Sequence, residues 1–431
     1  MRQGGLRLMQ ILFLADRVFE DLPGGSRVVA RELARGLAQR GHEVTFLVGR
    51  QGPEGLDETC REGVRIVRFH GGGSAAHYVR AGKSACAKLC GETPFDVVHT
   101  HFAYSALGPL KAVPKTVPQV RSFYGPWHAE GWVEDQSCLQ KMRSKVSGRF
   151  LAKAALCRLK YVLRSLVERA SLKRSRAVIV LSEQSRGEVL ALGYPPRHIQ
   201  KVAGGVDVQR FVPADDKQAV RAALGLPEDR RLLLSVRRLA PRMGLDNLIK
   251  AMPAIVARHP DVLLLIGGQG PERGRLERLV ADLGLGGHVC LVGFIPDAQL
   301  VAYYQSADLF VLPTVALEGF GLVTTEALAC GIPVIGTDVG ATPEILSGLD
   351  TRLIVPGTSP EALAEAISKF LEQDWAKGLT PERLHQFVLE HYQWDQHVEA
   401  VEQIYRDLMG ADNHAFSIVQ AGDHAFPGSS C

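Results

Sequence analysis

Short apolar runs alternate with helix-like segments along the whole chain, and this alternation constrains the fold more than any other feature. In the first half the runs cover residues 10–15, 44–48, 64–69, 97–100, 119–122 and 177–181. In the second half they cover residues 231–236, 262–266, 288–292, 309–312, 333–337 and 352–355. Buried strands that alternate with helices are typical of parallel sheets with crossover helices. The sequence therefore predicts an α/β protein with two doubly wound, Rossmann-like domains that face each other across a cleft.

A polar, proline-bearing stretch at residues 211–216 interrupts the pattern and indicates the domain boundary. A chain of 431 residues is too long for one ordinary core and fits two domains. We expect an N-terminal domain over residues 1–212 and a C-terminal domain over residues 213–391. Residues 410–431 are small and polar without a sustained period, which predicts a disordered tail.

The sequence predicts no membrane span, signal peptide or metal centre. No apolar run approaches the ~18 residues of a spanning helix, and the run at 11–14 is too short for a signal peptide. The 8 cysteines are scattered, with no Cys-x-x-Cys pair and no zinc spacing with histidine. This favours reduced thiols in a cytoplasmic protein.

Basic residues are concentrated in the first half of the chain. Residues 1–210 hold 33 Lys+Arg against 18 Asp+Glu, whereas the remainder holds 17 against 28. Residues 141–176 alone hold 12 Lys+Arg and a single acid, Glu168, among many apolar residues. Such a stretch is either a solvated face packed on its own domain or an amphipathic surface that is attracted to anionic lipid. We hypothesise docking to the inner face of a membrane; the lack of aromatic interleaving disfavours nucleic acid.

Glu318 and Glu326 stand eight positions apart, with a glycine-rich turn after the first and a predicted helix around the second. Eight residues span little more than two helical turns, so both carboxylates can face one crevice. The first turn of a helix leaves its backbone amides without internal partners. The four amides at this helix mouth belong to Gly319, Phe320, Gly321 and Leu322. Two acids around such donors suit a ligand with both hydroxyls and phosphates, which indicates a sugar nucleotide.

Glycines and arginines follow other predicted strands. Gly24-Gly25 precedes a predicted helix at 27–40, and close backbone approach to a ligand or tight packing both explain it. Gly267-Gly268-Gln269-Gly270 lacks the spacing and the acid of a dinucleotide fingerprint, which disfavours NAD. Arginines follow the strand at 231–236 and are suited to clamp a diphosphate, although a surface cluster is the alternative. These arginines are Arg237, Arg238 and Arg242.

Histidines and aromatic residues end two strands of the first half. We expect His99 and His101 to point to opposite faces, which argues against their joint binding of a metal. A single histidine there either orients a sugar or phosphate or has a structural role. Tyr124, Trp127 and His128 follow the strand at 119–122 and are candidates to line the cleft, although such aromatics are often core residues.

Taken in order, these motifs resemble the retaining glycosyltransferases of the GT-B fold, in the group marked by Glu-x7-Glu (family 4). The resemblance runs from about residue 10 to residue 394. The segments that carry it are Gly24-Gly25, 40–44, 96–101, 205–207 with Phe211, Arg238 with 244–246, 267–270, 292–294, 307–313 and 318–326.

The resemblance implies a nucleotide-diphosphate sugar (UDP-, GDP- or ADP-linked) on the C-terminal domain, a glycan or lipid-linked acceptor on the N-terminal domain, and a crossing helix at about 392–409. No cofactor or metal is required, because guanidinium groups and helix dipoles neutralise the phosphates. The implied catalytic residues are Glu318, Arg238 and His101. The implied donor contacts are Gly25, Arg242, Gly268, Phe294, Gly319, Phe320, Gly321, Leu322 and Glu326. The acceptor-side candidates are Tyr124, Trp127 and His128.

Two positions depart from the family pattern. Met243 stands where the family usually has lysine, and Arg242 one position earlier is a candidate to compensate. Tyr124 stands where the family usually has histidine, and tyrosine cannot shuttle protons near neutral pH without a large pKa shift. We favour retaining transfer to an acceptor hydroxyl in glycolipid, polysaccharide or other glycan synthesis. A catalytically silent nucleotide-sugar binder, an assembly subunit and a sugar-nucleotide epimerase of the same fold remain alternatives.

Overall fold

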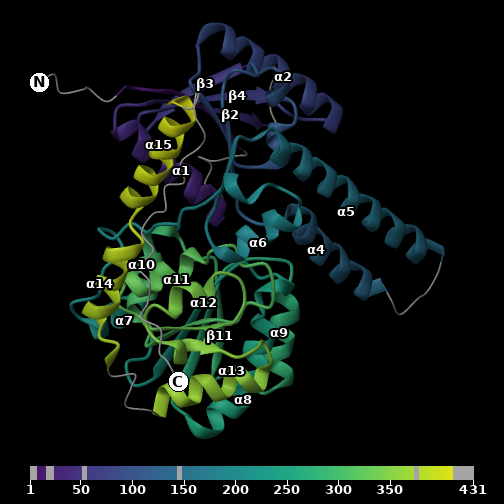
Figure 1. The fold of residues 1–431 in the computed structure, drawn as a ribbon. Helices are drawn as coiled ribbons and strands as arrows, with labels where there is room; N and C mark the ends of the chain where they lie inside the picture. The colour runs from purple at the N-terminus through teal and green to yellow at the C-terminus, as the bar shows by residue number, and fades with distance from the viewer. Residues whose placement is uncertain (1–6, 16–23, 51–55, 143–147, 373–377, 411–431) are drawn as a thin grey trace, which may run out of the picture.

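The computed structural model describes residues 7–15, 24–50, 56–142, 148–372 and 378–410. The predicted tail lies outside the described residues from position 411 onward. Two β-sheets, each flanked by helices, lie one above the other in Figure 1. The predicted fold class, two Rossmann-like α/β domains, is confirmed.

The first sheet has eight strands in the order β3-β4-β2-β1-β5-β6-β7-β8. All neighbouring strands are parallel except β3 and β4, which are antiparallel. The chain runs outward from β1 on one side and returns to β5 on the other, so the switch point lies between β1 and β5. The strands are β1 Gln10–Ala15, β2 Glu43–Arg50, β3 Leu56–Arg61, β4 Val64–His70, β5 Val97–Thr100, β6 Gln119–Phe123, β7 Ala177–Val180 and β8 Ile199–Lys201.

The second sheet is entirely parallel, in the order β11-β10-β9-β12-β13-β14. Its switch point lies between β9 and β12, where ligands of doubly wound sheets bind at the carboxyl ends of the strands. The strands are β9 Arg231–Val236, β10 Val262–Gly267, β11 Val289–Gly293, β12 Leu309–Leu312, β13 Val334–Thr337 and β14 Ile354–Val355.

Two edge strands were not predicted, and one predicted strand is shorter than expected. β3 is polar and mostly exposed, so it has no apolar run, and β8 has only 3 residues. The run at 352–355 begins as the 3-10 helix η4 Thr351–Leu353 and only then enters β14. At sheet edges, burial is too weak to impose an apolar pattern.

Helices cover both faces of each sheet (Figure 1). Those up to β8 are α1 Gly25–Gln39, α2 Ala75–Glu92, α3 Ala103–Ala106, η1 Pro109–Lys111, α4 Trp127–Met142, α5 Gly148–Arg174, α6 Glu183–Ala191 and η2 Pro196–His198. Those after β8 are α7 Lys217–Leu224, η3 Pro241–Met243, α8 Leu245–Arg258, α9 Arg273–Asp282, α10 Asp297–Ser306, α11 Leu322–Ala329, α12 Thr342–Leu346, η4, α13 Pro360–Glu372, α14 Pro381–His391 and α15 Trp394–Gly410.

The last helix, α15, packs with the first sheet rather than with the second, beside α1 in Figure 1. Val398, Val401 and Tyr405 of α15 are buried in one hydrophobic cluster with β1, β2 and α1. Gly36 of α1 allows this approach, because a Cβ there would lie 2.5 Å from a methyl group of Val398. The packing of α15 thereby stabilises the N-terminal sheet and α1.

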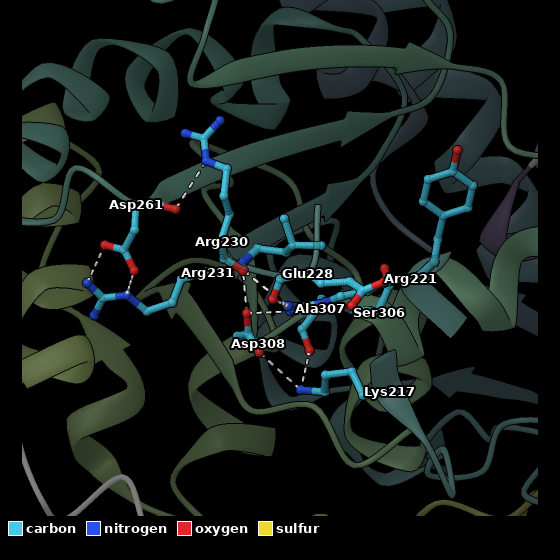
Figure 2. A network of polar contacts seen from close by, with 11 residues as sticks. Lys217, Arg221, Glu228, Arg230, Arg231, Asp261, Ser306, Ala307 and Asp308 are labelled. Atoms are coloured by element: carbon cyan, nitrogen blue, oxygen red, sulfur yellow. Dashed lines mark hydrogen bonds and ion pairs between the residues drawn. The ribbon is translucent and has the colours of Figure 1, made fainter. Parts of the chain in front are cut away.

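Polar contacts fix the amino-terminal edge of the second sheet (Figure 2). Asp308 accepts hydrogen bonds from Arg221 Nη2 at 2.6 Å, from Lys217 Nζ at 3.2 Å and from the Leu232 amide at 2.8 Å. Arg231 pairs with both carboxylate oxygens of Asp261, at 2.6 Å each. These bonds join α7, β9 and β12 at the end opposite to the switch-point loops. Asp308 therefore has a structural role.

Helices α4 and α5 form a hairpin that extends sideways from the first sheet (Figure 1). The connection at 143–147 lies outside the described residues. Within the described ranges, no helix is both long and apolar enough to cross a membrane.

Glu188 of α6 gives the fold a pH-dependent stability. Burial raises the pKa of Glu188 to about 7, and its Oε2 has no hydrogen-bond partner among the described residues. Because the folded pKa exceeds the unfolded value, the stabilisation is fully present below pH ~4.5 and is lost as pH rises through about 7. We expect Glu188→Gln to be about 1–2 kcal/mol more stable than the wild type at pH 8, a figure reduced for partial exposure.

Urea unfolding at pH 5 and pH 8 measures this difference, which should be several-fold smaller at pH 5. Glu183→Gln, at an exposed glutamate of the same helix, is the matched control. An equal gain for Glu188→Gln at both pH values would contradict the titration of Glu188.

Candidate functional site

Glu318 lies at the switch point of the second sheet, where β9 and β12 end. Its Oε2 accepts hydrogen bonds from Arg237 Nη2 and, at 3.1 Å, from Thr314 Oγ1. Arg237 directly follows β9, and Thr314 follows β12 by two residues. The carboxyl carbon lies 3.8 Å from the place of a Cβ on Gly321, the cap of α11. The first acid of the pair is therefore at the helix mouth.

Glu326 lies on α11 and faces α10. Its Oε2 accepts a hydrogen bond from the Tyr304 hydroxyl at 2.7 Å. Burial raises the pKa of Glu326, and the bond from Tyr304 partly opposes that shift. Tyr304 is fully buried, which fixes one carboxylate oxygen in place. Sequence reasoning missed Tyr304, because nothing in the helical pattern of 297–306 distinguishes it from an ordinary core tyrosine.

The turn between the two glutamates offers backbone groups rather than side chains. Gly321 has a φ of +81°, a left-handed conformation that glycine adopts without strain. Phe320 and Leu322 are buried, and both pack against Gly204. The amides of 319–322 donate no hydrogen bond to any residue that the structure describes. These amides therefore keep their hydrogen-bonding capacity for a ligand, whereas the side chains of Phe320 and Leu322 are used in packing.

Contacts between the two domains hold this turn. The carbonyl oxygen of Gly319 accepts hydrogen bonds from Ser182 Oγ at 2.9 Å and Ser185 Oγ at 3.4 Å, both at the start of α6. A Cβ at Gly319 would lie 2.5 Å from the carbonyl oxygen of Tyr124. Gly25 of α1 approaches Leu322, with 3.5 Å between its would-be Cβ and a Leu322 methyl group. The turn is thus enclosed by the first domain.

The three arginines after β9 have different surroundings. Arg237 is buried beside Glu318, whereas Arg238 is 58% exposed and pairs with Glu134 of α4 at 3.2 Å. Arg242 donates to the carbonyl oxygen of Leu317 at 2.6 Å and pairs with Glu130 of α4 at 3.2 Å. Arg238 and Arg242 therefore form ion pairs between the two domains, whereas Arg237 pairs with Glu318 inside the second domain.

Met243 and Gly268 contribute packing. Met243 is buried in the hydrophobic cluster that contains the second sheet, so its side chain serves the core and offers no charge to a phosphate. Gly268 has a φ of +135°, and a Cβ there would lie 1.8 Å from the carbonyl oxygen of Arg237. Phe294, which follows β11, is 51% exposed and leaves its ring available.

His101 is buried at the end of β5, and its Nδ1 lies 2.7 Å from the Tyr124 hydroxyl. Burial holds the pKa of His101 well below its usual value, so the ring is neutral at pH 7. The prediction that His99 and His101 point to opposite faces is wrong: their rings stack with centroids 4.4 Å apart. Residues two apart on a strand share a face. Both ring nitrogens of His99 are engaged, Nδ1 by Tyr405 and Nε2 by Ser122.

Trp127 and His128 begin the α4–α5 hairpin. His128 Nδ1 lies 3.0 Å from Oε2 of the buried Glu168 of α5. The Arg164 guanidinium of α5 lies 5.6 Å from the centre of the Trp127 ring, which is partly buried. His128 is therefore engaged within the hairpin, and Trp127 keeps some exposed surface.

Two family models match the chain over most of its length. The model for Glycosyltransferase Family 4 matches residues 23–210, and the model for Glycosyl transferases group 1 matches residues 216–388. The first range contains every strand of the first sheet except β1, and the second range contains the whole second sheet.

Individual relatives match to different extents. The chain is 33% identical, over 53% of its length, to a GDP-mannose-dependent alpha-(1-6)-phosphatidylinositol monomannoside mannosyltransferase of Mycolicibacterium smegmatis, and the match spans 62% of that relative. It is 28% identical, over 91% of its length, to the phosphatidyl-myo-inositol mannosyltransferase of the same organism, of which 92% is covered. Among solved structures, the sucrose-phosphate synthase of Thermosynechococcus elongatus is 26% identical with a TM-score of 0.76, covering 93% of this chain and 100% of that one.

Proposed function

Because this chain belongs to glycosyltransferase family 4, we propose that it transfers a sugar from a nucleotide-diphosphate sugar to an acceptor hydroxyl with retention of configuration. The observation that carries this proposal is the arrangement of Glu318 and Glu326 around unpartnered amides at the mouth of α11. Relatives whose names specify GDP-mannose, phosphatidylinositol monomannoside and phosphatidyl-myo-inositol support a GDP-linked donor and a lipid-linked acceptor.

In this proposal Glu326 accepts the ribose hydroxyls with the oxygen that Tyr304 leaves free. Glu318 contacts the donor sugar, and the amides of residues 319–322 bind its hydroxyls. Arg238, with Arg242, binds the diphosphate after leaving its carboxylate partner on α4. Phe294 stacks on the base, and Gly25 and Gly268 allow close backbone approach.

The reaction begins as the bond between C1 of the sugar and the diphosphate oxygen lengthens. Positive charge develops at C1, and negative charge develops on the departing diphosphate. Once Arg238 and Arg242 have bound the diphosphate, their guanidinium groups and the amide dipoles at the mouth of α11 stabilise its growing negative charge. The oxygen of the acceptor hydroxyl then bonds to C1 on the same face, and its proton passes to the departing diphosphate oxygen. His101 is neutral and its Nδ1 faces Tyr124, so its proposed role is to orient a hydroxyl.

Replacing Glu326 by alanine tests donor recognition. We expect the Kd for the nucleotide sugar to rise about 30-fold, because charge-assisted hydrogen bonds to a carboxylate contribute ~1.5–3 kcal/mol. Titration calorimetry with GDP- and UDP-linked sugars measures the change. Glu277→Ala, at a glutamate of α9 that pairs only with Arg273 among the described residues, is the control. Donor binding that survives Glu326→Ala would contradict the assignment, and a wild type that binds no donor would contradict the proposed function.

We also propose that α5 docks on an anionic membrane and brings a lipid-linked acceptor to the cleft. Six large aliphatic residues of α5 are exposed and lie within an arc of about 140° of the helix, at 100° per residue. They are Leu151, Leu156, Leu159, Val162, Leu163 and Leu166. This set is called the α5 stripe below.

The opposite side of α5 packs on the protein, through the buried Cys157, Glu168 and Leu172. Arg158 and Lys160 border the α5 stripe on its two sides by the same helical periodicity. An exposed apolar face with basic borders suits the interface of an anionic bilayer.

A further inference from the structure

Arg237 is the least exposed of the three arginines after β9, and its guanidinium joins two separate loop residues. Nη1 donates to Thr314 Oγ1, and Nη2 donates to Glu318 Oε2. Thr314 Oγ1 in turn lies 3.1 Å from the same Oε2. One oxygen of Glu318 is therefore held from two directions. No described residue bonds to Oε1.

The backbone under both donors is fixed to the sheet. The Arg237 amide donates to the Gly267 carbonyl oxygen at 2.8 Å, which continues the pairing of β9 with β10. Thr337 Oγ1, at the end of β13, donates to the Thr314 carbonyl oxygen at 2.6 Å. Because their backbones are bonded to the sheet, Arg237 and Thr314 hold the carboxylate of Glu318 in a fixed position relative to the sheet.

Glu318 stands on a loop outside the sheet. Its backbone carbonyl oxygen accepts a hydrogen bond from the Ala341 amide at 3.3 Å, but this bond does not set the direction of the side chain. Leu317 just before it has a φ of +59°, in the left-handed region. Its neighbour Gly319 is held only through its backbone carbonyl. An ionised carboxylate on such a loop needs a directional partner to hold one orientation, and the planar fork of arginine provides it.

We propose that Arg237 is a positioning residue for the transfer reaction. With Thr314, it engages Oε2 of Glu318 and leaves Oε1 for the donor sugar. This role rests on the proposed function and differs from that of Arg238 and Arg242, whose guanidinium groups face α4. Arg237 acts through Glu318, so its loss changes turnover rather than donor affinity.

The test compares Arg237→Gln, Arg237→Lys and Thr314→Val by kcat and by the Kd for GDP- and UDP-linked sugars. We expect Arg237→Gln to lower kcat about 30–100-fold and Thr314→Val about 3–10-fold, with donor Kd changed less than ~3-fold. Arg237→Lys keeps the charge and should recover part of the loss. Arg258→Gln, at an exposed arginine that pairs with Glu365 and Glu372, is the matched control.

A double-mutant cycle with Glu318→Gln separates positioning from an independent role. If Arg237 acts through Glu318, Arg237→Gln/Glu318→Gln has a kcat no lower than that of Glu318→Gln alone. The proposal would be overturned if the kcat losses of the two single variants multiplied in the double variant. It would also be overturned if Arg237→Gln raised the donor Kd and left kcat unchanged.

The same cycle measured by urea unfolding does not depend on the reaction. The urea midpoint of Arg237→Gln should be lower than that of the wild type, because the partly buried Glu318 carboxylate loses its cationic partner. The double variant should regain part of this loss in the midpoint. If the changes in midpoint of the two single variants simply added in the double variant, the coupling between Arg237 and Glu318 would be refuted, whether or not a sugar nucleotide is turned over. A wild type that shows this coupling but binds no donor would instead refute the proposed function.

Discussion

Replacing Glu318 by glutamine is expected to lower kcat for sugar transfer by about 10²–10³-fold, which is the scale of losing one preorganised electrostatic group. Glutamine has nearly the same volume and can still accept a hydrogen bond from Arg237 and Thr314. Only the negative charge beside the reacting carbon is removed. Because that charge matters most when positive charge develops at C1, the donor Kd should change less than ~3-fold.

Single-turnover kinetics with saturating donor, together with donor titration, measures the two effects separately. Glu365→Gln, at an exposed glutamate of α13, is the matched control. Equal kcat values for Glu318→Gln and the wild type would refute a catalytic role. A large rise in Kd with normal kcat would make Glu318 a binding residue only.

Much of the fold could be predicted because buried strands consist of apolar residues, which are visible in the sequence as apolar runs. The strands β1, β5, β9 and β12 begin and end where the apolar runs do, since they are central strands covered on both faces. The exposed β3 has no such run, and its place is set by pairing with β4. Prediction is therefore best in the centre of each sheet and poorest at its edges.

The candidate site was predicted in part, for the same reason. Glu318 and Glu326 stand in a local motif, so their spacing alone already predicted that both carboxylates can face one crevice. Their partners Arg237 and Tyr304 are 81 and 22 positions away, and only the folded sheet brings them together. Among three nearby arginines, sequence could not show which one is buried beside Glu318, because all three follow the same strand.

The ion pairs between the two domains could not be predicted from the sequence. Arg238 and Arg242 were interpreted as phosphate ligands, and their carboxylate partners Glu134 and Glu130 lie on a helix of the other domain. Helical spacing alone does place Glu130 and Glu134 on one face of α4. It does not reveal that this face meets η3.

Replacing Leu159, Leu163 and Leu166 of the α5 stripe by serine is expected to lower vesicle partitioning about 100-fold or more. Each of these side chains is slightly more than half exposed in the structure. Burying half of a leucine in the bilayer interface contributes ~1 kcal/mol, so the loss of three sums to ~3 kcal/mol. Because the residues face away from the packed side of α5, the free energy of unfolding should change little.

Sedimentation with vesicles of anionic and neutral phospholipid measures the partitioning, at low and at physiological salt. The matched control is Leu190→Ser/Leu283→Ser, at two exposed leucines outside α5. Charge reversal at Arg158 and Lys160 should remove the preference for anionic lipid and leave apolar partitioning in place. Equal pelleting of the wild type with both lipids, or no effect of the serine variant, would refute docking through α5.

Docking also predicts where activity is lost. If α5 delivers a lipid-linked acceptor, the serine variant should lose transfer to acceptor in vesicles, roughly in proportion to its lost partitioning. It should keep hydrolysis of the donor and transfer to a short-chain acceptor in solution, because Glu318, Arg237 and Glu326 are untouched. A variant that loses both activities would indicate damage to the cleft, through α4 and its pairs with Arg238 and Arg242, rather than lost docking.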